Sequence, residues 1–239
     1  MIRIRPPQSI YHARGTIENG TFAGRWHFSF DEYDDPQYVH FGTLRVFNDD
    51  TLSPGAVWPL HPHRNIEVVT YCAGGEFRHA DERGRGNVLK KGWVQHTTVG
   101  QGMYHSEINN RADAPMRFIQ MWFFPWKKDL APAVQQKAVK PAERTNRFLP
   151  LVSNQDPGAL PIESQARVFS CLLTTGHRVA HQLAAGQGAY LYNLEGGRVS
   201  LNGGALPALA AAMVTGEPHF EVTTEGETEL LLVEVGLPG

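Results

Sequence analysis

Short runs of alternating hydrophobic and polar residues follow one another along most of the chain. Residues 25–30 place Trp26, Phe28 and Phe30 on one face, and residues 66–72 are rich in β-branched and aromatic side chains. The 24 glycines and 16 prolines separate these runs, which is typical of an all-β chain with many turns. Further strands are predicted over residues 41–47, 76–79, 93–99, 103–109 and 116–124, and polar loops over residues 31–36 and 48–55.

The strand pattern is interrupted once, between residues 127 and 161. This segment is rich in Pro, Lys, Gln and Asn, and it predicts a connection that runs across the surface. Short strands return from residue 167, although residues 208–214 could form a helical turn. The predicted architecture is all-β, with two tandem antiparallel β-barrels of jelly-roll type. Their predicted bounds are 1–130 for the first barrel, 131–161 for the connection and 162–239 for the second barrel.

Composition excludes several classes of protein. The formal net charge is −2 and the pI is about 6.6, so no electrostatic footprint for nucleic acid or an anionic membrane is expected. The two cysteines, Cys72 and Cys171, form no CxxC motif and favour a reducing compartment. The N-terminus has no apolar signal-peptide core, and no apolar run approaches ~18 residues. A cytoplasmic protein is predicted.

Candidate chemistry is concentrated between Gly55 and Asn109. His61 and His63 stand one residue apart, and so do His105 and Glu107. Side chains two apart on a strand point to the same face, so each pair presents two ligands in one direction. Three neutral imidazoles and one carboxylate suit Fe, Mn, Co, Ni or Cu, and two positions of an octahedron would stay open for substrate or O₂.

A second carboxylate in this stretch, Glu67, has the same parity as His61 and His63. Two carboxylates on one divalent ion repel each other unless both bind, so one of Glu67 and Glu107 is expected to lie outside the ligand set. Residue types and spacing leave the choice between them open.

The spacing Gly55, His61-x-His63, Glu67, Gly74 resembles the first signature of the cupin superfamily. The stretches HPHRNIEVVTY, GQGMYHSE and HFSFDEYDDP, with LRVFNDD, resemble the pirin family within it, over roughly the first 125 residues. This resemblance implies a bicupin fold with a mononuclear iron site in the first barrel and a second barrel without ligands. It also implies His61, His63, His105 and Glu107 as ligands, and quercetin 2,3-dioxygenase activity in some members.

The function predicted on this basis is a metal-dependent dioxygenase that acts on quercetin or a similar enolisable aromatic compound, with O₂ as co-substrate. Glu107 would accept the hydroxyl proton of the substrate. The expected cofactor is one divalent transition metal, Fe²⁺ first, with Cu, Ni, Co, Mn or Zn as alternatives. A monomer is expected. The alternatives are a redox-responsive regulatory protein that acts through a protein partner, and another cupin chemistry that uses a base such as His96.

Other candidates are predicted to be structural. His79 and His96 are expected to be surface or core histidines, and His177 and His181 lie in a strand-like segment. The sequence Gly100-Gln101-Gly102 is expected to form a flexible loop at the barrel mouth. Among several core aromatic residues, a few, with Met103, could line an apolar pocket for a planar ligand; they are Trp58, Trp93, Tyr104, Trp122 and Phe123.

Overall fold

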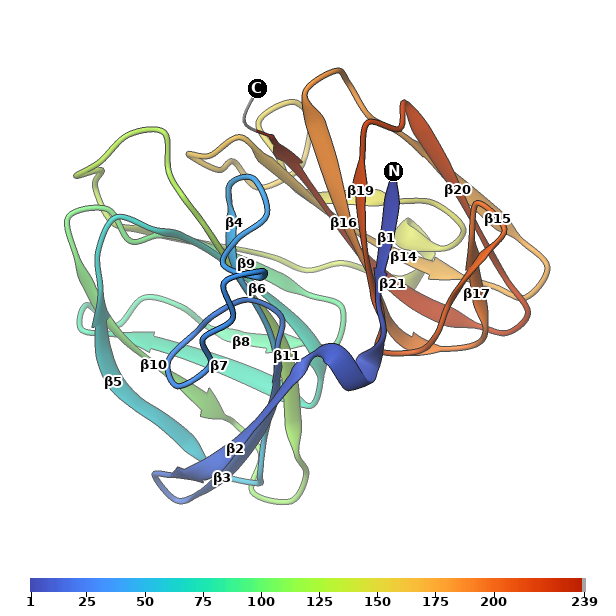
Figure 1. Ribbon diagram of the computed structural model, residues 1–239. Helices are drawn as coiled ribbons and strands as arrows, with labels where there is room; N and C mark the ends of the chain where they lie inside the picture. Colours follow the sequence, from blue (N-terminus) through green and yellow to red (C-terminus); the bar gives the residue numbers. More distant parts are fainter. Residues whose placement is uncertain (238–239) are drawn as a thin grey trace. The chain divides into compact units, whose positions relative to one another are not determined.

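The computed structural model describes residues 1–237, and their regular secondary structure consists almost entirely of antiparallel strands. The chain forms two compact units (Figure 1). One unit, called here the N-terminal barrel, comprises residues 11–139 and 160–165. The other, called the C-terminal barrel, comprises residues 1–10, residues 140–159 and the chain from residue 166. The predicted all-β fold of two barrels is confirmed.

The N-terminal barrel consists of two antiparallel sheets. The order of the larger sheet is β12 (Ala133–Lys137), β9 (Val94–Thr98), β6 (Glu67–Gly74), β11 (Met116–Phe123), β4 (Leu44–Leu52), β3 (Gly20–Trp26) and β2 (Tyr11–Ile17). The order of the smaller sheet is β5 (Val57–His63), β10 (Met103–Asn109), β7 (Glu76–Asp81) and β8 (Val88–Lys90). Apolar side chains of both sheets meet in a shared core that includes Leu52, Cys72, Phe77, Leu89 and Phe118.

The C-terminal barrel has the same plan. Its larger sheet runs β1 (Ile2–Arg5), β19 (Ala211–Thr215), β16 (Gln187–Gly196), β21 (Thr228–Gly236), β14 (Ala166–Leu173) and β13 (Leu149–Val152). Its smaller sheet runs β15 (Arg178–Gln182), β20 (His219–Thr224), β17 (Val199–Leu201) and β18 (Gly204–Leu206). Two short helices complete the described elements, a 3-10 turn over Pro7–Ser9 and α1 (Pro141–Arg144). No helix within residues 1–237 is long and apolar enough to cross a membrane.

The first ten residues belong to the C-terminal barrel, which differs from the predicted boundary. Strand β1 pairs with β19, with Ile2 opposite Val214 and Arg5 opposite Ala211 (Figure 1). Residues 160–165 in turn belong to the N-terminal barrel. Pairing between strands more than two hundred residues apart has no local sequence signal, so the linear bounds 1–130, 131–161 and 162–239 could not anticipate this exchange.

Three local predictions need correction. Residues 48–52 are the second half of strand β4, although they were predicted as a polar loop. Residues 211–214 belong to strand β19, so the alternative of a helical turn is wrong. The segment 127–161 contains β12, α1 and β13 as well as connecting loops. For the strands in these segments, pairing with neighbouring strands overrides the local preference of polar or small residues for turns.

The loop from Gly100 to Gly102 is tied down by backbone hydrogen bonds. The Gly100 carbonyl accepts from the Asn65 N–H at 2.9 Å, and the Gln101 N–H donates to the Leu130 carbonyl at 2.9 Å. Gly100 has a φ of +53°, and a Cβ there would lie 1.9 Å from the Leu130 oxygen. Only glycine permits this close approach. The loop thereby joins the end of β9 to the residues that follow His63.

Candidate metal centre

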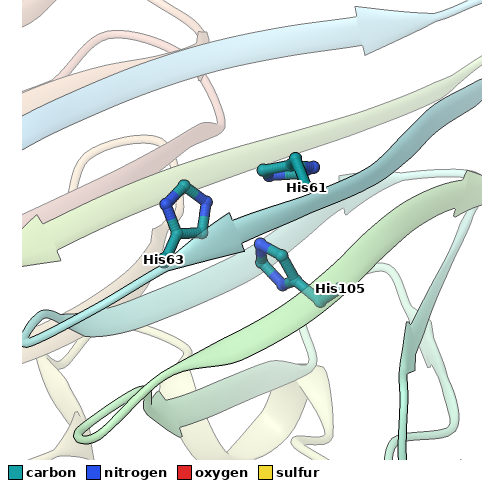
Figure 2. A group of neighbouring side chains, drawn as sticks. All are labelled: His61, His63 and His105. Carbon is teal, nitrogen blue, oxygen red and sulfur yellow. The ribbon is translucent and has the colours of Figure 1, made fainter.

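The three predicted histidines meet between β5 and β10. His105 lies directly opposite His61 in the antiparallel pair, and Met103 lies opposite His63. The ligand nitrogens of His61, His63 and His105 all lie within 4.8 Å of one another. Figure 2 shows the three rings turned toward a common point, two from β5 and one from β10. Within residues 1–237 no other group of three or more potential metal ligands gathers in this way.

A β-bulge shapes the β5 side of this group. His105 pairs with His61, but Glu107 pairs with Trp58, so β5 has one extra residue between these two pairs. The bulge contains Pro59, whose carbonyl lies 2.8 Å from His61 Nδ1. A carbonyl can only accept, so Nδ1 carries the proton and Nε2 keeps its lone pair. That nitrogen lies 4.0 Å from Glu107 Oε2.

Glu107 lies beside the histidines and is almost fully buried. Its Oε1 is 3.7 Å from His105 Nε2, and it accepts a hydrogen bond of 2.5 Å from Gln120 Nε2. Gln120 is itself held by Trp122, whose Nε1 donates to Gln120 Oε1 at 2.9 Å. The chain from Trp122 through Gln120 to Glu107 therefore fixes the orientation of the carboxylate.

Burial keeps the two deeper histidines neutral at neutral pH. Desolvation, with the neighbouring imidazoles His105 and His61, lowers the pKa of His63 to about 4. Desolvation, followed by His61 and His79, lowers the pKa of His105 to about 3. Neutral imidazoles are the form that binds metal ions.

The unpartnered nitrogens of this group fit a metal ion. His63 Nε2 and both ring nitrogens of His105 are buried and have no hydrogen-bond partner among the described residues. Buried polar atoms are normally paired, and a missing partner calls for an explanation such as an ion. With metal–nitrogen bonds of about 2.1 Å, ligand nitrogens stand roughly 3–4 Å apart, so nitrogens that all lie within 4.8 Å of one another are near enough to share an ion. The donor set of three imidazoles and one carboxylate suits a divalent transition metal.

Glu67 lies on the opposite face of the larger sheet from this group. Its Oε2 accepts hydrogen bonds from His96 Nε2 at 2.8 Å, Thr98 Oγ1 at 3.0 Å and the Glu163 N–H at 3.2 Å. Glu67 and His96 are both buried. His96 is thus occupied away from the histidine group, and the alternative that used it as a base there has no support.

The remaining predicted histidines are not part of the group. His79 is buried and its ring centroid lies 5.2 Å from that of His105, but its Nδ1 accepts from Gln95 Nε2 at 3.0 Å. His181 Nε2 lies 2.8 Å from Glu234 Oε2 in the C-terminal barrel. His177 is exposed beside Thr174.

A small pocket of about 80 Å³ adjoins the histidine group. Of the aromatic residues considered from the sequence, Trp58 and Trp122 line it, together with Phe30 and Phe118. Met103 and Phe123 are buried and Tyr104 is exposed, and none of them lines this pocket. Trp93 packs on the apolar core.

Three polar residues that line the pocket were not predicted: Asn48, Asp50 and Gln120. Asn48 and Asp50 come from the half of β4 that was predicted as a loop, and Gln120 comes from β11. The signal that could have found Gln120 is a single polar residue inside the apolar run FIQMWFF.

The sequence of this chain is similar to those of known cupin proteins along most of its length. The family model named pirin matches residues 9–123, and a model described as the quercetinase C-terminal cupin domain matches residues 151–235. A Pseudomonas aeruginosa protein named "Putative quercetin 2,3-dioxygenase" is 37% identical over 98% of this chain and 100% of its own length. The quercetin 2,3-dioxygenase of Escherichia coli K12 is 26% identical over 98% of this chain and 99% of its own length.

A solved structure resembles the whole chain closely. The bacterial pirin YhhW of Escherichia coli in complex with nickel(II) superposes with a TM-score of 0.89 and 25% identity, and each chain is covered completely.

Proposed function

This chain belongs to the pirin family of cupin proteins, and from that premise we propose that it is a metal-dependent dioxygenase that cleaves the ring of quercetin, a similar flavonol or another enolisable aromatic compound. One observation carries the proposal: three histidine side chains, two of which have buried, unpartnered nitrogens, adjoin Glu107 and a pocket with aromatic walls. Relatives named for quercetin 2,3-dioxygenase activity support the choice of substrate class and of O₂ as oxidant.

Four residues would hold the metal: His61, His63, His105 and Glu107. We propose iron(II), and Cu, Ni, Co, Mn and Zn suit the same donors. The ion would supply a Lewis acid and a redox centre at which the enolic oxygen of the substrate and O₂ come together.

The chain's own groups would orient the substrate and move its proton. Trp58 and Trp122 offer apolar surfaces against which an aromatic ring packs. Glu107 Oε1 accepts from Gln120, so Oε2 is the atom placed to accept the hydroxyl proton of the substrate.

The test uses protein reconstituted anaerobically with iron(II), mixed with quercetin and O₂. We expect quercetin consumption with matching O₂ uptake in the wild type, and loss of both bound metal and turnover in His61→Ala and His105→Ala. His177→Ala, an exposed histidine of the other barrel, is the matched control and should keep both. Turnover by metal-free His61→Ala would contradict the mechanism.

A regulatory protein is the second candidate. Leu60 and Tyr104 are 58% and 52% exposed and stand on β5 and β10, next in sequence to His61 and His105. Exposed apolar side chains so near the proposed metal could form part of a surface for a protein partner. Tight iron binding without turnover of any flavonol would favour this candidate.

A further inference from the structure

Strand β4 presents two polar side chains to the pocket beside the histidine group. Asn48 and Asp50 are two residues apart, so they share one face of the strand, and both line the pocket. They are 2% and 4% exposed. Polar side chains this deeply buried are costly unless they are hydrogen-bonded.

Neither side chain is fully satisfied by the protein. Asn48 Oδ1 is buried and has no hydrogen-bond partner among the described residues. Asp50 Oδ1 accepts from Trp26 Nε1 at 3.1 Å, and Oδ2 makes no hydrogen bond within residues 1–237. Asparagine and a carboxyl group at the edge of a pocket are suited to bind hydroxyl and carbonyl oxygens of a ligand.

Asp50 is held in place with one carboxyl oxygen left for a ligand. Burial, which exceeds the opposing effect of the Trp26 hydrogen bond, raises the pKa of Asp50 to about 8. Because one oxygen of this carboxyl group accepts from Trp26, the other is left for a ligand. Gly24 lies opposite Asp50 on β3, and a Cβ at Gly24 would come within 2.1 Å of Asp50 Oδ1. The backbone therefore makes room for this carboxyl group.

The pocket volume limits the size of the ligand. A cavity of about 150 Å³ is enough for one benzene ring, and pockets that enclose drug-sized ligands measure about 300–1,000 Å³. The pocket here measures about 80 Å³ and is partly open to solvent, and His61, His63 and Glu107 are among its lining residues, so a bound metal ion would take up part of this volume. One ring can therefore enter with part of its edge outside, whereas the three rings of a flavonol cannot be enclosed.

The walls are fixed against simple widening. Trp122 contacts Phe30 edge to face, with ring centroids 5.3 Å apart, and contacts His63 at 4.6 Å. Its Nε1 is also bound to Gln120. A ligand that displaced Trp122 would have to break these contacts and the hydrogen bond to Gln120, the residue that orients Glu107.

We propose that the preferred substrate is a compact, single-ring compound with a hydroxyl and a carbonyl group, and that Asn48 and Asp50 bind its carbonyl group while the ring packs against Trp58 and Trp122. This inference rests on the proposed function, and it narrows the substrate class. Asn48 and Asp50 would determine the substrate specificity. The four proposed metal ligands would decide which reaction follows.

The test compares maltol with quercetin. Maltol is a hydroxypyranone with the same enol and carbonyl pair as the central ring of a flavonol. Binding to the iron-loaded protein is measured without O₂, by calorimetry and by quenching of tryptophan emission, so no turnover is needed. Protein-bound iron is measured after each titration, because both compounds can chelate the metal. We expect maltol to bind at least about 10-fold more tightly than quercetin.

Variants then test the two polar residues. Asn48→Ala and Asp50→Ala should each weaken maltol binding by about 3–10-fold, the effect of one neutral hydrogen bond. Asp50→Asn, which keeps the size, the acceptor for Trp26 and a donor, should retain the wild-type affinity. Asn87→Ala, at an exposed asparagine of the same barrel, is the control for a nonspecific effect. Unchanged iron content shows that each variant is folded at the site.

The outcomes separate this inference from the proposed function. Equal or tighter binding of quercetin by the wild type overturns the inference, and so does unchanged maltol affinity in both alanine variants. Weakened maltol binding in either alanine variant, together with weaker binding of quercetin by the wild type, supports it. If maltol binds as expected but neither compound is consumed with O₂, the inference stands and the proposed function fails.

Discussion

Gln120 fixes the position of Glu107 at the centre of the N-terminal barrel. Its amide donates to Glu107 Oε1 and accepts from Trp122 Nε1, so one side chain joins the carboxylate to the aromatic wall of the pocket. Groups that hold metal ligands in place commonly change metal affinity by about 10–100-fold when they are removed. A residue that touches no metal can therefore decide how well this site binds one.

We predict that Gln120→Leu lowers iron affinity by about 10–100-fold while the protein stays folded, because leucine fills a similar volume and lacks the amide donor. Competition with a chelator of known affinity measures the change. Gln135→Leu, the same substitution on the edge strand β12, should leave the affinity unaltered. Unchanged affinity in Gln120→Leu would show that Glu107 needs no support to reach the metal.

At the scale of elements, the sequence predicts correctly which side chains share a face when they lie in the same strand. It predicts wrongly where pairing with another strand determines whether a segment is a strand or a loop. The pairs His61/His63 and His105/Glu107 could be placed on common faces because each pair lies within one strand. Asn48, Asp49 and Asp50 were predicted as a loop because three polar residues in a row usually form one. In the structure Arg117 of β11 binds Asp49 through two hydrogen bonds of 2.7 and 2.6 Å, and Trp26 of β3 binds Asp50.

The choice between Glu67 and Glu107 shows the same limit. Residues two apart in one strand share a face of that strand. The same spacing counted across a turn does not show whether a side chain on the next strand points to the same side. Glu67 follows a turn after β5 and begins β6, where it faces His96 and Thr98. Its carboxylate joins β6, β9 and residue 163, so its expected role is to hold these three segments together.

We predict opposite effects for two matched substitutions. Glu67→Gln should keep one bound iron per chain and lower the free energy of unfolding by about 1–3 kcal/mol, because a buried acceptor of three hydrogen bonds loses its charge. Glu107→Gln should lose iron affinity with a smaller change in stability. Metal analysis and urea unfolding measure both quantities. Loss of iron in Glu67→Gln, together with retention of iron in Glu107→Gln, would show that Glu67 is the metal ligand and that Glu107 has the structural role.

At the scale of the molecule, each barrel contains one buried cysteine. Cys72 lies on β6 of the N-terminal barrel, and Cys171 lies on β14 of the C-terminal barrel. Both are fully buried, and burial raises the pKa of Cys171 to about 12, so the folded chain presents no reactive thiolate there. A thiol reagent can modify either cysteine only after the surrounding structure opens. Each sulfur therefore reports the opening of its own barrel.

We predict that iron slows the labelling of Cys72 much more than that of Cys171. The proposed ligands all belong to the N-terminal barrel, and an ion bound only to the folded form reduces opening by a factor of one plus its concentration over its Kd. At 100 times the Kd this is about a hundredfold. The measurement uses Cys171→Ala and Cys72→Ala variants in mild denaturant, so that each reports one thiol. Equal slowing of both would mean that the two barrels open as one cooperative unit, whereas no slowing of Cys72 would place the metal elsewhere.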